Sequence, residues 1–188
     1  ADFKRCFDDT LAACAENGLK TILWPGYDLS GDAAAQCERV MEPFKTAPSL
    51  VAWLPIDEPD MGSPAVRDGI SACIGEFRKR DPYHPAYMNN FSTGLPARYA
   101  AMTDILSIDD YITNGENRTV GSVLAKLAAM TGVAAQHRKP AWMFLSGNNL
   151  HNHPREPSVA EQTAQTYGTL ITGCSGIVYF LGQPSCRL

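Results

Sequence analysis

The sequence predicts an α/β fold, because short apolar segments alternate along it with longer segments of helical periodicity. Six segments indicate strands, since each is too short and too continuously apolar for a surface helix. In the segments between them, apolar residues recur every three or four positions, as on the buried face of a helix. Strands that alternate with helices every 20 to 35 residues or so predict parallel pairing through right-handed crossovers.

The predicted elements follow one another with few residues left over. The predicted strands are residues 19–24, 50–56, 85–90, 104–109, 140–145 and 176–180. The predicted helices are residues 3–17, 33–46, 65–80, 95–102, 119–136 and 158–172. Gly18 is the expected stop of the first helix, and Pro96 is acceptable in the first turn of the short fourth one.

Polar residues that follow the strands favour a closed (β/α)8 barrel, also called a TIM barrel, over an open sheet. Asp57 and Glu58, Asn89 and Asn90, and the segments 109–111 and 146–149 all follow strand ends, which a barrel gathers into one ring. An open doubly wound sheet usually adds a Gly-rich phosphate loop, which is absent here. With 188 residues, the chain is shorter than the ~250 of a full barrel. We therefore expect one partial barrel domain, residues 1–188, with strands three to eight present and the N-terminal strands missing.

Composition excludes several classes of partner. The net charge is −4, and lysines and arginines are scattered, which argues against a nucleic-acid surface or a polybasic membrane patch. No apolar run reaches the ~18 residues of a membrane span. No Cys-x-x-Cys pair is present, and His151, His153 and Glu156 lack the spacing of a zinc site. We expect no cofactor, no metal, no nucleic acid and no membrane span, with an uncharged partner.

The cysteines and two glycosylation sequons favour an extracellular or secretory location. Six widely spaced cysteines permit disulfides, and neighbouring elements would bring Cys6 or Cys14 to Cys37, and Cys174 to Cys186. The alternative is that they are small buried apolar residues. The sequons at Asn90 and Asn117 are in line with a secreted glycoprotein.

The order of the motifs resembles the clan A (β/α)8 glycoside hydrolases and their uncharacterised relatives, over nearly the whole chain. The matching segments are 53–59 with its Asp-Glu-Pro, 81–85, 104–111 with its Asp-x-Tyr, 139–142, and 155–158 followed by Glu161, Tyr167 and 173–180. The resemblance implies a carbohydrate substrate and places the acid/base glutamate at the end of the fourth strand.

Glu58 is the residue that matches this acid/base position. Asp57 would point the other way, since successive strand residues alternate faces. Pro59 is expected to hold Glu58 in an extended conformation. Trp24 and Trp53 are the expected apolar neighbours that would raise the pKa of a catalytic acid. The alternative is a solvated turn before a helix.

The chain departs from the resemblance on the seventh strand, where clan A retaining enzymes carry a nucleophilic glutamate. Ser146 stands near that position, and a serine cannot replace a carboxylate at an oxocarbenium-like transition state. Asp109 is the preferred second carboxylate, with Tyr111 as a hydrogen-bonding partner and Asp110 as the fallback if the strand parity is opposite. The alternative for Asp109 is hydrogen bonding to loop amides.

Further residues at the strand ends are predicted to bind substrate. Trp24 is the best sugar platform among the aromatic residues, since it ends a strand. Asn89 and Asn90 are expected to bind sugar hydroxyls, a role that an N-glycan on Asn90 would prevent. The predicted substrate-binding set is Trp24, Asn89, Asn90, Asp110, Tyr111, Ser146 and Asn148, and His84 is expected to be structural.

Two functions from different classes remain open at this point. The first is a glycoside hydrolase with Glu58 as general acid. The second is a non-catalytic carbohydrate-binding or extracellular structural module that kept the barrel and lost the nucleophile. An unrelated barrel enzyme, such as an aldolase, is disfavoured because no strand-end lysine is present. Another chain or an upstream segment is expected to complete the barrel.

Overall fold

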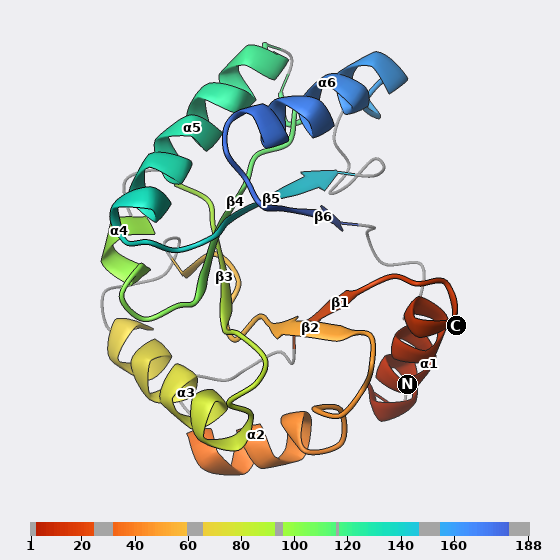
Figure 1. Cartoon of the computed structure of the whole chain (residues 1–188), viewed down its shortest axis with the longest axis vertical. Coiled ribbons are helices and arrows are strands. Elements are labelled where there is room, and N and C mark those ends of the chain that lie inside the picture. The colour runs from red at the N-terminus through yellow and green to blue at the C-terminus, as the bar shows by residue number, and fades with distance from the viewer. Residues whose placement is uncertain are drawn as a thin grey trace. The chain divides into compact units, whose positions relative to one another are not determined.

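The computed structural model confirms the α/β architecture with parallel sheets (Figure 1). It describes residues 3–24, 32–59, 66–92, 96–115, 117–146 and 155–180. The described residues divide into two compact units, unit 1 up to Met88 and unit 2 from Asn89 to Phe180. Strands in the described part form a two-stranded and a four-stranded sheet, without a closed barrel. All twelve predicted elements are present, with their ends adjusted.

Unit 1 consists of three helices and a short parallel sheet. Its elements are α1 (Phe3–Glu16), β1 (Thr21–Leu23), α2 (Ala33–Met41), β2 (Leu50–Trp53) and α3 (Val66–Arg80). In the β1–β2 pair, Leu23 lies opposite Trp53, and Trp53 also forms a parallel bridge with Ala86. Gly18 has a φ of +68° after α1, the conformation that ends helices at glycine.

The core of unit 1 forms where the helices bury their apolar faces on the strands. Trp53 and Phe77 lie at its centre with their rings edge to face, 6.1 Å between centroids. The cluster consists of Leu11, Leu23, Cys37, Val40, Met41, Phe44, Leu50, Trp53, Cys73 and Phe77. These residues come from all five elements, so the core ties the sheet to its helices.

The second helix is shorter than the sequence predicted, ending at Met41 instead of residue 46. Pro43 explains the difference, since proline has no N–H for the helical hydrogen bond and its ring clashes with the preceding turn. The chain continues as turns, and Phe44 still reaches the core. Apolar spacing therefore extended the prediction beyond the point where the backbone can stay helical.

Unit 2 contains the longest helix, α5, and most of the four-stranded sheet. Its elements are β3 (Tyr87–Asn90), whose first two residues belong to unit 1, α4 (Pro96–Tyr99), β4 (Ile105–Asp109), α5 (Val120–Gln136), β5 (Ala141–Ser146), α6 (Val159–Ile171) and β6 (Gly176–Phe180). The strand order is β3-β4-β5-β6, and β4, β5 and β6 run parallel. Helices α5 and α6 lie on the same side of these strands (Figure 1).

Side-chain caps start both long helices of unit 2. Thr119 and Ser122 form a reciprocal capping box before α5, and Ser158 and Glu161 form one before α6. Arg155 holds Glu161 through two hydrogen bonds of 2.7 and 2.8 Å. These bonds, together with those from Ser158, lower the pKa of Glu161 to about 2. Residues 155–161, which contributed to the resemblance, thus form the N-terminal cap of α6.

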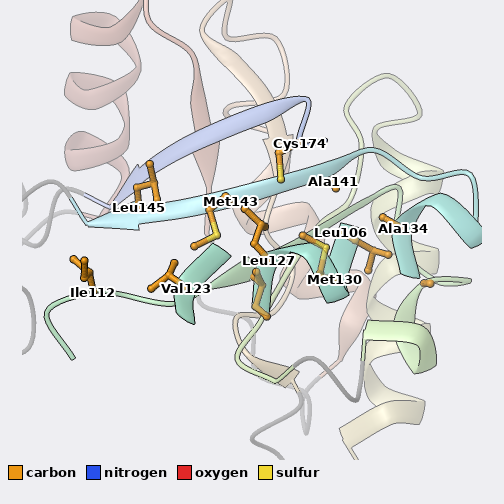
Figure 2. Close-up of a cluster of buried hydrophobic side chains, with 12 residues drawn as sticks. Leu106, Ile112, Val123, Leu127, Met130, Ala134, Ala141, Met143, Leu145 and Cys174 are labelled. Atoms are coloured by element: carbon orange, nitrogen blue, oxygen red, sulfur yellow. The ribbon is translucent and has the colours of Figure 1, made fainter. Parts of the chain in front are cut away.

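The main core of unit 2 lies between α5 and the sheet. Figure 2 shows Val123, Leu127 and Met130 of α5 packed with side chains of β4 and β5. The buried members are Ala100, Leu106, Ile108, Ile112, Val123, Leu127, Met130, Ala134, Ala141, Met143, Leu145 and Cys174. The members on β4 and β5 are alternate residues of each strand, so one face of each strand packs in the core.

The expected disulfide pairs are wrong. Cys37 and Cys174, each a member of a predicted pair, are free thiols, as are Cys14 and Cys73. Cys6 is disulfide-bonded. Cys174 lies in the core of unit 2, where burial raises the pKa of its thiol to about 12. For the buried free cysteines, the alternative interpretation as small apolar residues describes their environment.

Candidate functional site

The carboxyl ends of the parallel strands of unit 2 lie at one edge of its sheet. Asp109 at the end of β4 is opposite Phe144, and Ser146 at the end of β5 is opposite Phe180 at the end of β6. These ends were predicted to carry the functional residues, because barrels present their active sites there. The register therefore brings Asp109 and Ser146 to the same edge.

The two faces of this sheet have different roles. Leu106, Met143 and Leu145 face α5 in the core (Figure 2), and Ile108 belongs to the same buried cluster. Side chains alternate along a strand, so Ser107 and Asp109 of β4, and Phe144 and Ser146 of β5, lie on the opposite face. We call this face, together with Asn89, which bonds to Ser107, the site face.

Strand parity separates Asp109 from Asp110. Asp109 lies on the site face, whereas Asp110 lies just past the strand in contact with cations. The Asp110 carboxylate is buried, with Oδ1 bonded to Arg118 and Oδ2 3.9 Å from Lys126 Nζ. Asp109 thus lies at the end of β4 on the site face, and the fallback residue Asp110 is part of an ion-pair cluster.

The neighbouring asparagines hold β3 to β4. The Ser107 hydroxyl donates to Asn89 Oδ1 at 3.0 Å, and Asn90 Nδ2 donates to the Ser107 carbonyl at 3.0 Å. Both asparagines are buried, and Asn90 is 0% exposed. A glycan on Asn90 would require space around a side chain that is fully buried, so the folded unit has no room for it. Asn117, by contrast, is exposed.

Aromatic rings lie beside Ser146 on the site face. Phe144 and Phe180 contact edge to face, with centroids 6.3 Å apart. Ser146 is buried at the end of β5, where its hydroxyl is the last side chain of the strand. Tyr111 is half-buried, and its carbonyl accepts a turn hydrogen bond from Asn114. Asn148, the remaining predicted contact, lies outside the described residues, as do His151 and His153.

In unit 1, Glu58 has a left-handed backbone, with a φ of +43°. The expectation of an extended conformation is therefore wrong. The ring of Pro59 disfavours the right-handed helical region for Glu58, and the chain turns through the left-handed one instead. Among the described non-glycine residues, only Arg138 also has positive φ, and it follows the end of α5, where such residues are common. No helix end explains Glu58.

The two tryptophans expected near Glu58 have different environments. Trp53 is fully buried in the core with the helices, and its indole Nε1 donates to Asp81 Oδ2 at 2.8 Å. Its primary role is thus structural. Trp24, which directly follows β1, is 52% exposed, an exposure that a sugar platform would need.

Asp81 is the centre of a hydrogen-bond cluster that sequence reasoning missed. Its carboxylate accepts from Trp53 Nε1, and lies 2.7 Å from His84 Nδ1. It also accepts from the backbone N–H groups of Tyr83 and His84. Burial raises the pKa of Asp81, but the hydrogen bonds from Trp53 and His84 outweigh it and lower the pKa overall. The Asp-Pro turn signal at 81–82 was the available clue.

Sequence reasoning also missed Arg118 and Lys126. Lys126 Nζ lies 4.5 Å from the centroid of the Phe91 ring and 3.5 Å from the Asp109 carbonyl oxygen. No sequence signal marked these residues, because a lysine seven residues into a helix is usually solvated. Within the described ranges, no group of three potential metal ligands occurs, and no helix is long and apolar enough to cross a membrane.

Solved structures similar to this chain are glycosidases with the TIM-barrel fold. A β-glucuronidase from an uncultured Clostridium sp. has 14% identity and a TM-score of 0.63, covering 92% of this chain and 35% of its own. The Ruminococcus gnavus β-glucuronidase has 14% identity and a TM-score of 0.64, with the same coverage. A Rhizomucor miehei β-1,3-glucanosyltransferase mutant in complex with laminaritriose has 12% identity and a TM-score of 0.58, covering 90% of this chain and 68% of its own.

No family model and no curated protein match the sequence. The chain spans about a third of the length of the β-glucuronidases. At these identities the likeness concerns the backbone alone, and it indicates that the α/β arrangement of this chain is similar to that of TIM-barrel glycosidases.

Proposed function

We propose that this chain acts on carbohydrate as a glycoside hydrolase, with Glu58 as general acid and Asp109 as second carboxylate. The observation that carries the proposal is the left-handed backbone of Glu58. A non-glycine residue in this region costs about 1–2 kcal/mol, and such strain is concentrated at functional sites. Glycine would adopt this backbone conformation at lower cost. The presence of glutamate at this position, after β2 and before the buried Pro59, therefore suggests that the carboxyl group itself is needed there.

The chemistry of the two residues suits glycoside hydrolysis. The reaction needs a carboxylic acid that protonates the leaving oxygen and a second carboxylate that activates water or attacks the sugar. The reaction would require them to approach to about 5–10 Å. The fold of the similar structures supports the proposal, since β-glucuronidases and a glucanosyltransferase are carbohydrate-active enzymes by name. Within the barrel, the six strands would be the third to eighth.

The decisive variant is Glu58→Gln, which keeps the shape and removes the proton. We expect hydrolysis of natural glycans to fall by about 10²-fold or more, with less loss for aryl glycosides whose leaving groups need little protonation. Asp109→Asn should also lower turnover by about 10²-fold. The matched control is Glu16→Gln at the exposed end of α1. Wild-type turnover by Glu58→Gln on a natural glycan would remove Glu58 from the mechanism.

Backbone strain at Glu58 gives a test that does not depend on knowing the substrate. Glycine accepts positive φ without a steric cost, so Glu58→Gly should raise the free energy of unfolding by about 1 kcal/mol. Arg138→Gly should raise the free energy of unfolding by a similar amount, since Arg138 also has a positive φ, of +54°. The proposal requires that only Glu58→Gly abolish activity. Chemical denaturation and glycan turnover of both variants provide the comparison.

The binding-module alternative is favoured by one observation, the serine at the end of β5. A sugar site without the seventh-strand carboxylate can bind without reacting. If the wild-type chain binds glycans in calorimetry but hydrolyses none in a broad panel of natural and aryl glycosides, the binding module replaces the hydrolase.

We also propose that another chain or a further segment of polypeptide completes the barrel. Apolar residues on α6 are exposed, with Tyr167 at 64%, Leu170 at 51% and Ile171 at 84%. Apolar surface of this kind is usually covered in the working protein. An extracellular or secretory location remains part of this proposal. Native mass measurement of the purified protein from its source would overturn it by finding a monomer of these 188 residues.

A further inference from the structure

A cluster around Lys126 connects three segments at the carboxyl edge of the unit 2 sheet. Its members are Phe91 after β3, Asp110 after β4, Arg118 before α5, and Lys126 on α5. We call it the β4 clamp. The Lys126 ammonium contacts the Phe91 ring, the Asp110 carboxylate and the Asp109 carbonyl oxygen. One cation thereby contacts the chain just after β3 and the end of β4, where Asp109 lies.

The environment of the clamp makes these contacts stronger than surface ion pairs. The Asp110 side chain is 2% exposed, and those of Lys126 and Arg118 are 20% and 31% exposed. A buried carboxylate needs cations or hydrogen-bond donors to offset its lost hydration. Partial desolvation also strengthens the contact of an ammonium with an aromatic face. Asp110 is therefore anchored, and Lys126 has little freedom to leave.

The β4 clamp restricts the orientation of the Asp109 side chain, because it holds the chain at residues 109 and 110. Lys126 holds the carbonyl of Asp109, and the cations hold the side chain of the next residue. Fixing the backbone at residue 109 and the side chain at residue 110 sets the direction in which the Asp109 side chain leaves the backbone. Catalytic groups need placement to within about 0.5 Å, and misplacement by about 1 Å can cost 10²-fold in rate.

We propose that Lys126 is a positioning residue, which acts through the β4 clamp to aim the Asp109 carboxylate on the site face. The consequence for activity rests on the proposed function, whereas the effect on the strand end does not. Lys126→Met keeps the apolar stem of the side chain near Phe91 and removes the charge and the donor. Lys126→Arg keeps both, and Lys139→Met provides a control elsewhere in unit 2.

The first experiment measures hydrogen exchange of a peptide covering residues 105–112 in the full chain. We expect faster exchange in Lys126→Met, with Lys126→Arg and Lys139→Met close to wild type. Unchanged exchange in Lys126→Met, at matched global stability, would overturn the clamp. This result does not require that the protein be an enzyme, so it separates failure of the clamp from failure of the proposed function.

The second experiment uses a carbohydrate readout. With a hydrolysed substrate, Lys126→Met should lower kcat about 10-fold or more and change KM by less than about twofold, and Lys126→Arg should recover most of the rate. Without turnover, the readout is the Kd for a bound glycan, which should rise about 10-fold. A general loss of folded protein would lower the apparent kcat without changing KM, so kcat is normalised to the folded fraction measured by circular dichroism. An unaffected readout after this normalisation would overturn the positioning role.

A double-variant cycle tests whether the clamp acts as a unit. Asp110→Asn and Lys126→Met should each lower the same readout, and the double variant should be no worse than the more damaging single one. Fully additive effects would mean that the two residues act independently, which contradicts the proposal.

Discussion

Two buried aspartates, Asp81 in unit 1 and Asp110 in unit 2, differ in how their charge is compensated. Asp81 is surrounded by neutral or titratable donors, namely the Trp53 indole, two backbone N–H groups and the His84 ring. Asp110 is compensated by the permanent cations Arg118 and Lys126. Hydrogen bonds of fixed geometry make the first a structural anchor. Cations that are partly exposed to solvent make the electrostatics of the second sensitive to dissolved salt.

The position of each aspartate along the chain agrees with this difference. Asp81 lies in the turn that precedes β3, and its partners tie that turn to β2. Asp110 directly follows β4. In parallel α/β proteins, residues that precede strands mainly stabilise the fold, whereas residues at the carboxyl ends of strands build sites. The Asp81 cluster is therefore expected to control folding, and the β4 clamp to control the local geometry around Asp109.

The largest expected effect is the loss of stability in Asp81→Ala. Removing the carboxylate leaves the buried indole N–H of Trp53 and the backbone donors without their acceptor, at about 1–3 kcal/mol for each buried group left unsatisfied. We expect a total loss of about 3 kcal/mol in the free energy of unfolding. Urea denaturation provides the measurement, with Asp9→Ala as a control, since the Asp9 side chain on α1 is 74% exposed. A loss below about 1 kcal/mol would show that the cluster is not an anchor.

Asp110→Ala should cost less, about 2 kcal/mol, although Asp110 is just as buried. Removing one partner of a fully buried ion pair costs about 3–5 kcal/mol. Here Lys126 and Arg118 are partly exposed and regain hydration when the carboxylate is removed. The same urea measurement ranks the two variants. A greater loss for Asp110→Ala than for Asp81→Ala would reverse the comparison.

Acid should weaken the Asp81 cluster in a defined direction. The pKa of Asp81 is lowered in the folded protein from an ordinary value of 3.8. The unfolded chain therefore binds the proton more readily, so this contribution to stability is fully present above pH 3.8 and is lost as the pH falls through the folded pKa. Asp81→Asn should flatten this part of the stability profile, measured by thermal melts between about pH 2 and 5. A parallel profile for the variant would assign the acid sensitivity to other groups.

Salt should have the smallest effect and should distinguish the clusters most directly. Ions screen charges that reach the surface and act weakly on neutral hydrogen bonds in the interior. The difference in unfolding free energy between wild type and Asp110→Asn should therefore shrink by a few tenths of a kcal/mol in about 1 M NaCl. The difference for Asp81→Asn should stay the same. Equal salt dependence in both variants would show that the two aspartates have similar electrostatic environments.

Several features of the site were predictable because they depend on local periodicity. The apolar runs placed Asp109 near the end of β4 and located the β2 segment before Glu58. The strand parity that separates Asp109 from Asp110 was left open and came from the register of β4 with β5. The backbone conformation of Glu58 was not predictable from Pro59, because the preference before proline is local and the required turn is set by the packing around it. The structural role of Trp53 was also missed, since its partner Asp81 is 28 residues away.

The sequence by itself determined the order and type of the secondary structure elements. The spacing of apolar residues, the glycine after α1 and the capping residues of α5 and α6 are signals that act within a few residues of the chain. Only the tertiary structure decided which charges meet. Lys126 and Asp109 are 17 residues apart, and a helix must fold back on its strand before they approach. Such contacts depend on the packing of whole elements, so no local pattern encodes them.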